Sequence, residues 1–320
     1  MLLRKLPDLA AADAEFRSSF AANWGRENCI IWGLSRRAQF GPCAHGLSIR
    51  SVWGGEERCQ FDGRTVAVDD DNFLILNNGR ICATQIESAV PVESFAISFR
   101  LGLVERAYAA MSVSLEKALA QGSASVERSA EFMECLQPHD RRISPVLRYI
   151  KAHVLRGCDD EAWYEEQLEF LLERMLVHRD AELRRIERFR LIRPATRREV
   201  YRRISLATDF LHSNYARQIS LNELAAAACI SKYHFLRLFQ LVHRVTPHQY
   251  LMRKRSQVAW RLLQTSQLSI EEVAFRVGFA QRTLLRQLRR WTGHSPAELR
   301  RTLTLATSVG SIASSVQPPL

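Results

Sequence analysis

Two short stretches of the chain carry side chains that can hydrogen-bond to the edges of DNA bases. An Arg side chain can bind guanine O6 and N7 together, and a Gln side chain can bind adenine in the same two-point manner. Phosphates attract Lys, Arg and the free amides at helix N-termini. The candidates are Ser231, Lys232, Tyr233, His234, Arg237 and Gln240 in the first stretch, Arg253 between the stretches, and Gln281, Arg282, Thr283, Arg286 and Arg289 in the second. This chemistry predicts a surface for double-stranded DNA.

The two stretches belong to an internal repeat. The segment 220–250 aligns without a gap with 269–299, at an offset of 269 − 220 = 49 residues. At this offset Arg237 matches Arg286 and Pro247 matches Pro296. A duplicated supersecondary unit explains this agreement better than chance does.

Each repeat has the pattern of two short helices. Ser220 and Ser269 are N-cap residues, and Glu223 and Glu272 stand three positions later, as a capping box requires. Apolar residues at helical spacing follow in both repeats, namely Leu221, Leu224, Ala225 and Ala228, then Ile270, Val273, Ala274 and Val277. After breaks at 229–231 and 278–280, second helices are expected to begin near Ser231 and Gln281. They would bury Phe235, Leu238 and Phe239, or Leu284 and Leu288. This is the plan of a helix-turn-helix.

A longer helix is predicted between the repeats, from Pro247 to about Gln264. Tyr250, Leu251, Val258, Leu262 and Leu263 would line its buried side, and Arg253, Lys254, Arg255 and Arg261 would decorate its outside. Such a helix would hold the two second helices in major-groove segments about one turn, ~34 Å, apart.

The charge of the chain is concentrated around these motifs. Residues 196–302 hold 19 Lys and Arg against 6 Asp and Glu, a net charge of +13, so the rest of the chain carries 11 − 13 = −2. A strongly basic third is suited to a polyanion. The alternative interpretation is an ordinary all-α domain on which Arg237 and Arg286 are merely solvated charges.

Several motifs in this third resemble the DNA-binding domain of the AraC/XylS family of bacterial transcription regulators. They are I-S-x-x-H-F-x-R-x-F at 230–239, T-P-x-x-Y-L at 246–251, A-x-x-L-L at 259–263, S-I-x-E-V-A-x-x-V-G-F at 269–279 and T-G-x-S-P-x-x-x-R at 292–300. The resemblance implies a regulator that binds promoter DNA through two recognition helices, contacts RNA polymerase and forms a homodimer. It leaves open whether a small-molecule effector exists.

Two positions depart from the family pattern. The interval from Gly278 to Leu284 is one residue shorter than usual, and Arg244 stands where a Gly commonly precedes the Thr-Pro pair. We therefore expect an uncommon backbone conformation at Arg244.

The N-terminal part has the pattern of a β domain. Short strands are predicted at 48–53, 65–68, 73–76 and 95–99, with turns at Gly54-Gly55, Asp62-Gly63, 69–72 and 77–80. Residues 57–79 resemble the cupin-like sensor domain that often precedes the family's DNA-binding domain. The predicted fold class is thus α+β with two domains. A cupin-like β-barrel with following helices would precede an all-α domain of two helix-turn-helix motifs joined by a linker helix.

Helices are predicted after the strands, near 103–121, 126–136, 144–155 and 161–178. By resemblance they would carry dimer contacts, and the apolar candidates are Trp163, Leu168, Leu171, Leu172, Met175 and Leu176. Packing on their own barrel is the equal alternative. The predicted domains are 1–190 and 200–302, with a linker at 191–199 and a disordered tail at 303–320.

The remaining functional hypotheses are weaker. His45 alone cannot supply a metal site, and neither a metal nor a cofactor is expected. The seven cysteines favour buried thiols over a thiol sensor. Cys43 follows Pro42 but precedes Ala44, so it lacks the Pro-Cys-His setting of a DNA-repair methyltransferase, and no enzymatic activity is expected. A constitutive dimeric regulator without an effector remains open. With no membrane helix or secretory signal predicted, a cytoplasmic location is expected.

Overall fold

The computed structural model describes residues 2–3, 23, 25–119, 130–189 and 193–292. The chain divides into two compact units, Met1–Ser205 and Leu206–Leu320. The division falls within helix α5 (Arg197–Ser213), which begins inside the predicted linker. The predicted domain boundaries remain predictions, and the tail at 303–320 lies outside the described residues.

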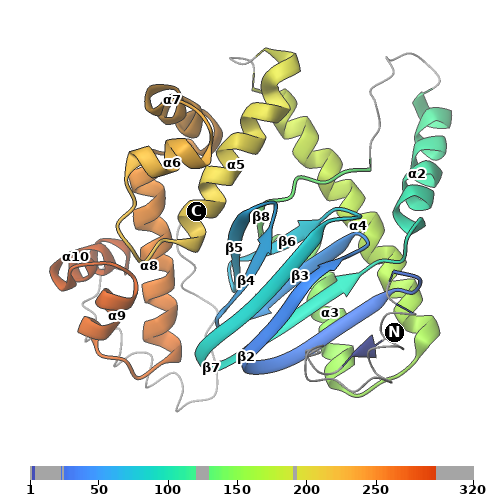
Figure 1. The fold of residues 1–320 in the computed structure, drawn as a ribbon, viewed down its shortest axis with the longest axis horizontal. Helices are drawn as coiled ribbons and strands as arrows, with labels where there is room; N and C mark the ends of the chain where they lie inside the picture. Colours follow the sequence, from blue (N-terminus) through green and yellow to red (C-terminus); the bar gives the residue numbers. More distant parts are fainter. Residues whose placement is uncertain (1, 4–22, 24, 120–129, 190–192, 293–320) are drawn as a thin grey trace. The chain divides into compact units, whose positions relative to one another are not determined.

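The first unit contains one mixed sheet (Figure 1). Its strands are β1 (Leu2–Leu3), β2 (Cys29–Ala44), β3 (Ser48–Trp53), β4 (Glu56–Phe61), β5 (Arg64–Asp69), β6 (Asn72–Leu76), β7 (Ile81–Ser98) and β8 (Leu136–Pro138). The order is β1-β2-β7-β3-β6-β8, and β4 pairs with both β5 and β7. Only the β1–β2 pairing among these is parallel, and the described strands do not close into a ring. The predicted α+β fold class with a cupin-like N-terminal unit is confirmed, but the described strands form an open mixed sheet where a barrel was predicted.

The Asp62-Gly63 turn fixes the register of the β4–β5 hairpin. Both residues have positive φ, 48° and 70°. This combination is typical of a type I′ turn, whose twist matches that of the flanking strands. The strands continue directly from it, with Phe61 opposite Arg64.

Among the described residues of this unit, helices α2 (Leu103–Leu119), α3 (Ser144–Leu155) and α4 (Glu161–Glu187) accompany the sheet. The sheet core includes Ile49, Phe73, Phe95 and Ile97. The same core contains the apolar face of α4, namely Leu168, Leu171, Leu172, Met175 and Leu176, with Trp163 partly buried against it. Of the two interpretations of this face, packing on its own unit is therefore the observed one.

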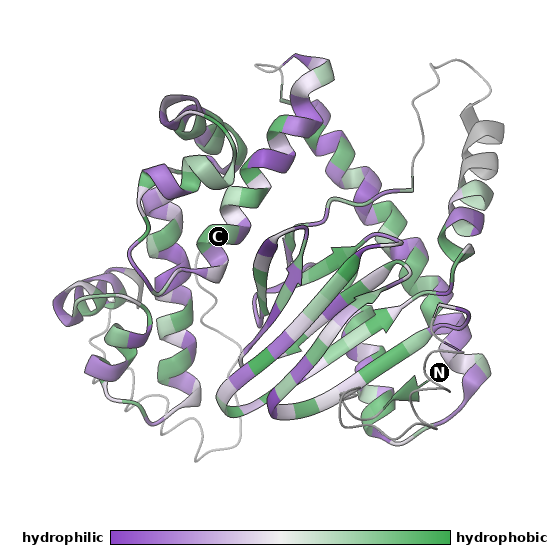
Figure 2. Ribbon diagram, in the orientation of Figure 1, coloured by the Kyte–Doolittle hydropathy of each residue, from purple (hydrophilic) through white to green (hydrophobic). Residues whose placement is uncertain are grey.

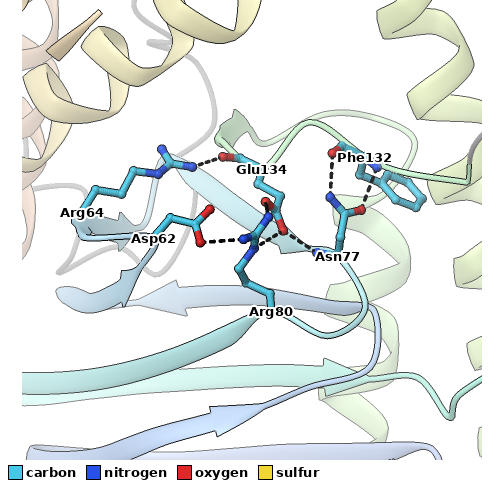
Figure 3. Close-up of polar contacts among 6 residues, drawn as sticks. All are labelled: Asp62, Arg64, Asn77, Arg80, Phe132 and Glu134. Atoms are coloured by element: carbon cyan, nitrogen blue, oxygen red, sulfur yellow. Dashed lines mark hydrogen bonds and ion pairs between the residues drawn. The ribbon is translucent and has the colours of Figure 1, made fainter. Parts of the chain in front are cut away.

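The helix predicted at 126–136 is wrong over its described part. Residues 130–135 are not helical, and Leu136 begins strand β8, while 126–129 lie outside the described residues. Figure 3 shows the reason: Asn77 exchanges two side-chain hydrogen bonds with the backbone of Phe132, of 2.8 and 2.9 Å. Glu134 accepts from the amide of Asn77 and pairs with Arg80. These contacts across the fold hold the segment extended against the helical preference of its residues.

The second unit is helical. It contains the C-terminal part of α5, then α6 (Leu221–Ala227), α7 (Lys232–His243), α8 (Pro247–Thr265), α9 (Ile270–Arg276) and α10 (Gln281–Thr292). Helices α6 and α7 pack together near one end of α8, and α9 and α10 near the other (Figure 1). The predicted helix order is confirmed. Across the described part of both units, every helix is too short or too polar to cross a bilayer.

Candidate DNA-binding surface

Both repeats begin with the predicted capping box. In the first, the Ser220 hydroxyl accepts from the Glu223 amide at 3.2 Å, and the Glu223 carboxylate accepts from the Ser220 amide at 2.8 Å. In the second, Ser269 and Glu272 exchange the same two bonds, at 3.1 and 2.6 Å. Each box satisfies amides that the first helical turn leaves without partners, which fixes where α6 and α9 begin.

Both motifs turn through a residue of positive φ, Cys229 at 52° and Gly278 at 73°. In each case the next amide reaches back five residues, from Ile230 to Ala225 at 3.1 Å and from Phe279 to Ala274 at 2.8 Å. These bonds close the helix C-terminus and redirect the chain into the second helix. The repeat seen in the sequence is therefore a repeat in backbone conformation.

Helix α7 separates its buried and exposed sides as predicted. Phe235, Leu238, Phe239 and Val242 are buried. All six candidates of this stretch are exposed, namely Ser231, Lys232, Tyr233, His234, Arg237 and Gln240. Tyr233 is 86% exposed, so its ring is accessible to a partner.

Helix α10 presents a more basic exterior. Leu284 and Leu288 are fully buried, while Gln281, Arg282, Arg286 and Arg289 are exposed and Thr283 is half-buried. Hydrophilic residues predominate on this helix in Figure 2. Four arginines and no acidic residue lie on α10, whereas α7 carries one lysine and one arginine. The exposure of the candidates agrees with the proposed contacts, but their role in binding DNA stays a prediction.

The prediction for the exterior of α8 was partly wrong. Arg253 is exposed and Arg261 half-buried, but Lys254 and Arg255 are only 1% and 7% exposed. Burial lowers the pKa of Arg255 from its ordinary value. A signal for this burial was present in the sequence, because Lys254 and Arg255 follow Leu251 by three and four positions and precede Val258 on the same helical stripe. The prediction gave more weight to the charge of these two residues than to their spacing.

Arg244 ends α7 in the left-handed conformation, with φ of 62°. Its amide donates to the Gln240 carbonyl at 2.8 Å. Thr246 then caps α8 through a capping box with Gln249. The uncommon backbone predicted for Arg244 is confirmed.

A cluster of aromatic and histidine side chains joins α7 to α5 and α8. It was not predicted from the sequence. Thr208 on α5 hydrogen-bonds to His243 at 2.9 Å, and His212 hydrogen-bonds to the Tyr250 hydroxyl at 3.0 Å. The rings of His243 and Tyr250 lie edge to face at 4.8 Å. Since these residues come from three helices, no spacing along the sequence could reveal the cluster.

Most titratable candidates of the first unit are buried, whereas Cys43 and Cys158 are half-buried. His45 is buried, and this burial lowers its pKa to about 4. Cys59 and Cys82 lie in the core, where a hydrogen bond between them raises the pKa of Cys59 and lowers that of Cys82. In the described ranges, His, Cys, Asp and Glu side chains form no group of three or more that could hold a metal ion.

Two family models match the chain in the order of its units. The AraC-like ligand binding domain matches residues 39–151, and a helix-turn-helix domain matches residues 224–302.

Curated relatives match over part of the chain. The HTH-type transcriptional regulator AlkR of Acinetobacter baylyi is 34% identical over 84 residues, which are 26% of this chain and 28% of AlkR. The probable transcriptional regulator LumQ of Photobacterium leiognathi is 28% identical over 161 residues, which are 49% of this chain and 59% of LumQ. The chain thus spans less than two thirds of the length of these curated relatives.

Among solved structures, the DNA-binding domain of AdpA in complex with a target DNA is 33% identical, with a TM-score of 0.31. The match covers 32% of this chain and 93% of that chain. The chain thus combines an AraC-like ligand binding domain with a helix-turn-helix domain that contains two capped motifs, and it is similar in sequence to transcriptional regulators.

Proposed function

We propose that the protein is a sequence-specific transcription regulator that reads promoter DNA with α7 and α10. One observation carries the proposal: two motifs of the same backbone conformation each leave a basic, Gln-bearing side of the second helix exposed. A major groove admits one α-helix, and Arg and Gln are suited to guanine and adenine edges.

Different roles follow for different side chains. Tyr233, His234 and Arg237 on α7, and Gln281, Arg282 and Arg286 on α10, are proposed to contact bases. A second set of side chains is proposed to contact DNA beside these bases, and its charged members are proposed to contact phosphates. This set is Ser231, Lys232, Gln240, Arg253, Thr283 and Arg289.

The test is binding of the full-length protein to DNA from its own upstream region and to random DNA, over a series of salt concentrations. We expect selective binding and a footprint over two adjacent major-groove segments. Weak, sequence-indifferent binding that modest salt abolishes would leave only an electrostatic attraction and would contradict the proposal.

The first unit is proposed to respond to a small-molecule effector, because an AraC-like ligand binding domain matches 39–151. A ligand that shifts the equilibrium must bind one state preferentially, so it must raise the melting temperature of that state. A screen in which no compound stabilises the protein or alters DNA binding would favour the second candidate, a constitutive regulator.

We further propose a homodimer. With the predicted apolar face of α4 buried in its own unit, the large apolar residues that this helix exposes are Phe170, 45% exposed, and Val177, 40% exposed. They stand seven residues apart and so share one side of the helix. Sedimentation of the wild type and of Phe170→Glu would test this contact, and a monomeric wild type would refute it. RNA polymerase as a partner, a cytoplasmic location and action without catalysis complete the proposal.

A further inference from the structure

Arg255 on α8 connects two segments that are far apart in the sequence. Its Nε donates to the carbonyl of Tyr215 at 2.7 Å, its Nη2 to that of Arg217 at 2.7 Å, and its Nη1 to that of Gly278 at 2.6 Å. Tyr215 and Arg217 precede the first motif, and Gly278 is the turn of the second. We call this set of three bonds the Arg255 bridge.

The bridge has a planar donor group matched to its acceptors. A guanidinium presents its N–H groups in a rigid fork, so one side chain can satisfy three carbonyls in fixed directions. The Arg255 side chain also lies over the Phe279 ring, with Cζ at 5.7 Å from the ring centroid. A buried cation needs hydrogen bonds, and here neutral backbone carbonyls supply them.

Gly278 brings the second motif into direct contact with the same loop. A Cβ atom at Gly278 would collide with the carbonyl oxygen of Ala216 and would lie 3.1 Å from Cζ of Arg255. Only a residue without a side chain allows the turn of the second motif to approach this loop so closely.

The loop is in turn fixed to the first motif. The guanidinium of Arg217 donates to Glu223 at 2.7 Å. Glu223 is the acidic residue of the capping box of α6. Hydrogen bonds from Ser220 and the Arg217 guanidinium hold the pKa of Glu223 at about 2, so it is a carboxylate at neutral pH. A continuous path of contacts therefore runs from the turn of the second motif, through Arg255 and Arg217, to the start of the first.

We propose that Arg255 is a positioning residue that sets the spacing between the two recognition helices, and hence the number of base pairs between the two DNA segments they read. The inference rests on the proposed function and adds what determines the spacing. Helix α8 holds the second motif through a shared apolar core that includes Leu263, Val273 and Leu284, although α9 joins α8 through the non-helical segment 266–269. Apolar packing is non-directional, and the Arg255 bridge adds directional hydrogen bonds that fix the orientation of the second motif on this core.

The experiment uses the full-length protein and DNA duplexes that the wild type selects from a randomised library. The selected duplex is then altered by inserting or deleting one to four base pairs between the two protected segments. One inserted base pair moves a segment by ~3.4 Å and rotates it by about 34° around the DNA axis. We expect each unfavourable insertion to lower the affinity of the wild type about ten-fold or more. This loss is similar to that caused by one mismatched base pair in a specific site. Arg255→Gln should lose about three-fold or less, because its second motif can pivot to follow the displaced segment.

Arg253→Gln is the matched control, since it removes the same charge from an exposed position two residues earlier on the same helix. It should weaken binding to all spacings by one factor and leave their ratios unchanged. Arg255→Lys keeps the charge but cannot reach three carbonyls, so its ratios should fall between those of the wild type and Arg255→Gln. A duplex with the first segment alone should bind wild type and Arg255→Gln equally.

The inference is overturned if Arg255→Gln keeps the sharp spacing preference of the wild type. If Arg255→Gln does not fold, the same criterion applies to Arg255→Lys. If wild type selects no preferred sequence at all, the proposed function fails instead, and the two failures are distinguishable. Circular dichroism of each variant establishes which one is folded.

Discussion

The turns of the two helix-turn-helix motifs share one backbone conformation but differ in what surrounds them. Cys229 in the first motif and Gly278 in the second both have positive φ. Cys229 is exposed, whereas Gly278 meets the Ala216 carbonyl where a Cβ would be. The comparison separates two reasons for a glycine. Left-handed backbone costs a side chain only about 1–2 kcal/mol, which the first motif tolerates, but a collision with backbone cannot be relieved by a rotamer change.

The largest expected effect on stability is that of an alanine at the turn of the second motif, compared with an alanine at the turn of the first. Gly278→Ala should destabilise the second unit by ~3 kcal/mol or more, since left-handed strain and the collision add. Cys229→Ala, the matched change in the first motif, should stay within about 0.5 kcal/mol because a Cβ is already present there. Hydrogen exchange of peptides from the second unit measures both. Equal effects at the two turns would show that packing does not distinguish them.

A second contrast concerns how α7 and α8 contact DNA. Arg237→Ala should cost about 1–3 kcal/mol on the preferred sequence and relax the preference at one base position. Arg253→Ala should weaken preferred and random DNA alike and reduce the dependence of binding on salt. Fluorescence anisotropy against single-base variants separates the two patterns, and a uniform loss for Arg237→Ala would refute its base-reading role.

The capping box of the first motif should respond to acid. The pKa of Glu223 is about 2 in the folded state against an ordinary value of 4.5. Because the folded value is the lower one, the stabilisation is complete above about pH 4.5 and is lost as the pH falls towards 2. Helix α6 should therefore loosen over that interval in the wild type, and Glu223→Gln should remove this dependence. NMR of the α6 amides during an acid titration would reveal it, and unchanged amide shifts in the wild type would contradict the assignment.

The smallest effect is expected at Arg244. Its left-handed conformation should make Arg244→Gly stabilising, but by less than ~1 kcal/mol, because glycine also loses more conformational freedom on folding. The position 49 residues later in the repeat is Gly293. A measured decrease in melting temperature would show that the Arg244 side chain makes contacts outweighing the backbone strain.

The helices of the second unit could be predicted from the sequence because their signals are local. Capping boxes, turns and apolar stripes lie within a few residues, and the repeat states them twice. The same holds for the Asp62-Gly63 hairpin. Strand pairing is less local, so the sequence pattern did not predict β2 or β4 as strands and predicted only the C-terminal end of β7. Strands β2 and β7 nevertheless pair from Cys29 with Ser98 to Ala44 with Ile81.

The errors have a common physical origin. The helix predicted at 126–136 followed the composition of the segment, but Asn77 and Arg80, more than fifty residues away, hold its end extended. Lys254 and Arg255 were placed outside because they are charged, whereas the acceptors of Arg255 come from loops on both sides of α8. The exposure of the candidates on α7 and α10 could be predicted because each helix buries one apolar stripe. Residues on the opposite side of such a helix are exposed.

The Arg255 bridge also bears on how this protein could be recombined with others. The sequence repeat suggests that each helix-turn-helix motif is a separate module that can be exchanged between regulators at the end of α8. The bridge crosses that junction. A chimera that imports only the second motif brings a foreign turn against the Tyr215–Arg217 loop, and any side chain in place of Gly278 prevents the two from fitting. The smallest exchangeable part is therefore the loop, both motifs and the helix between them, taken together.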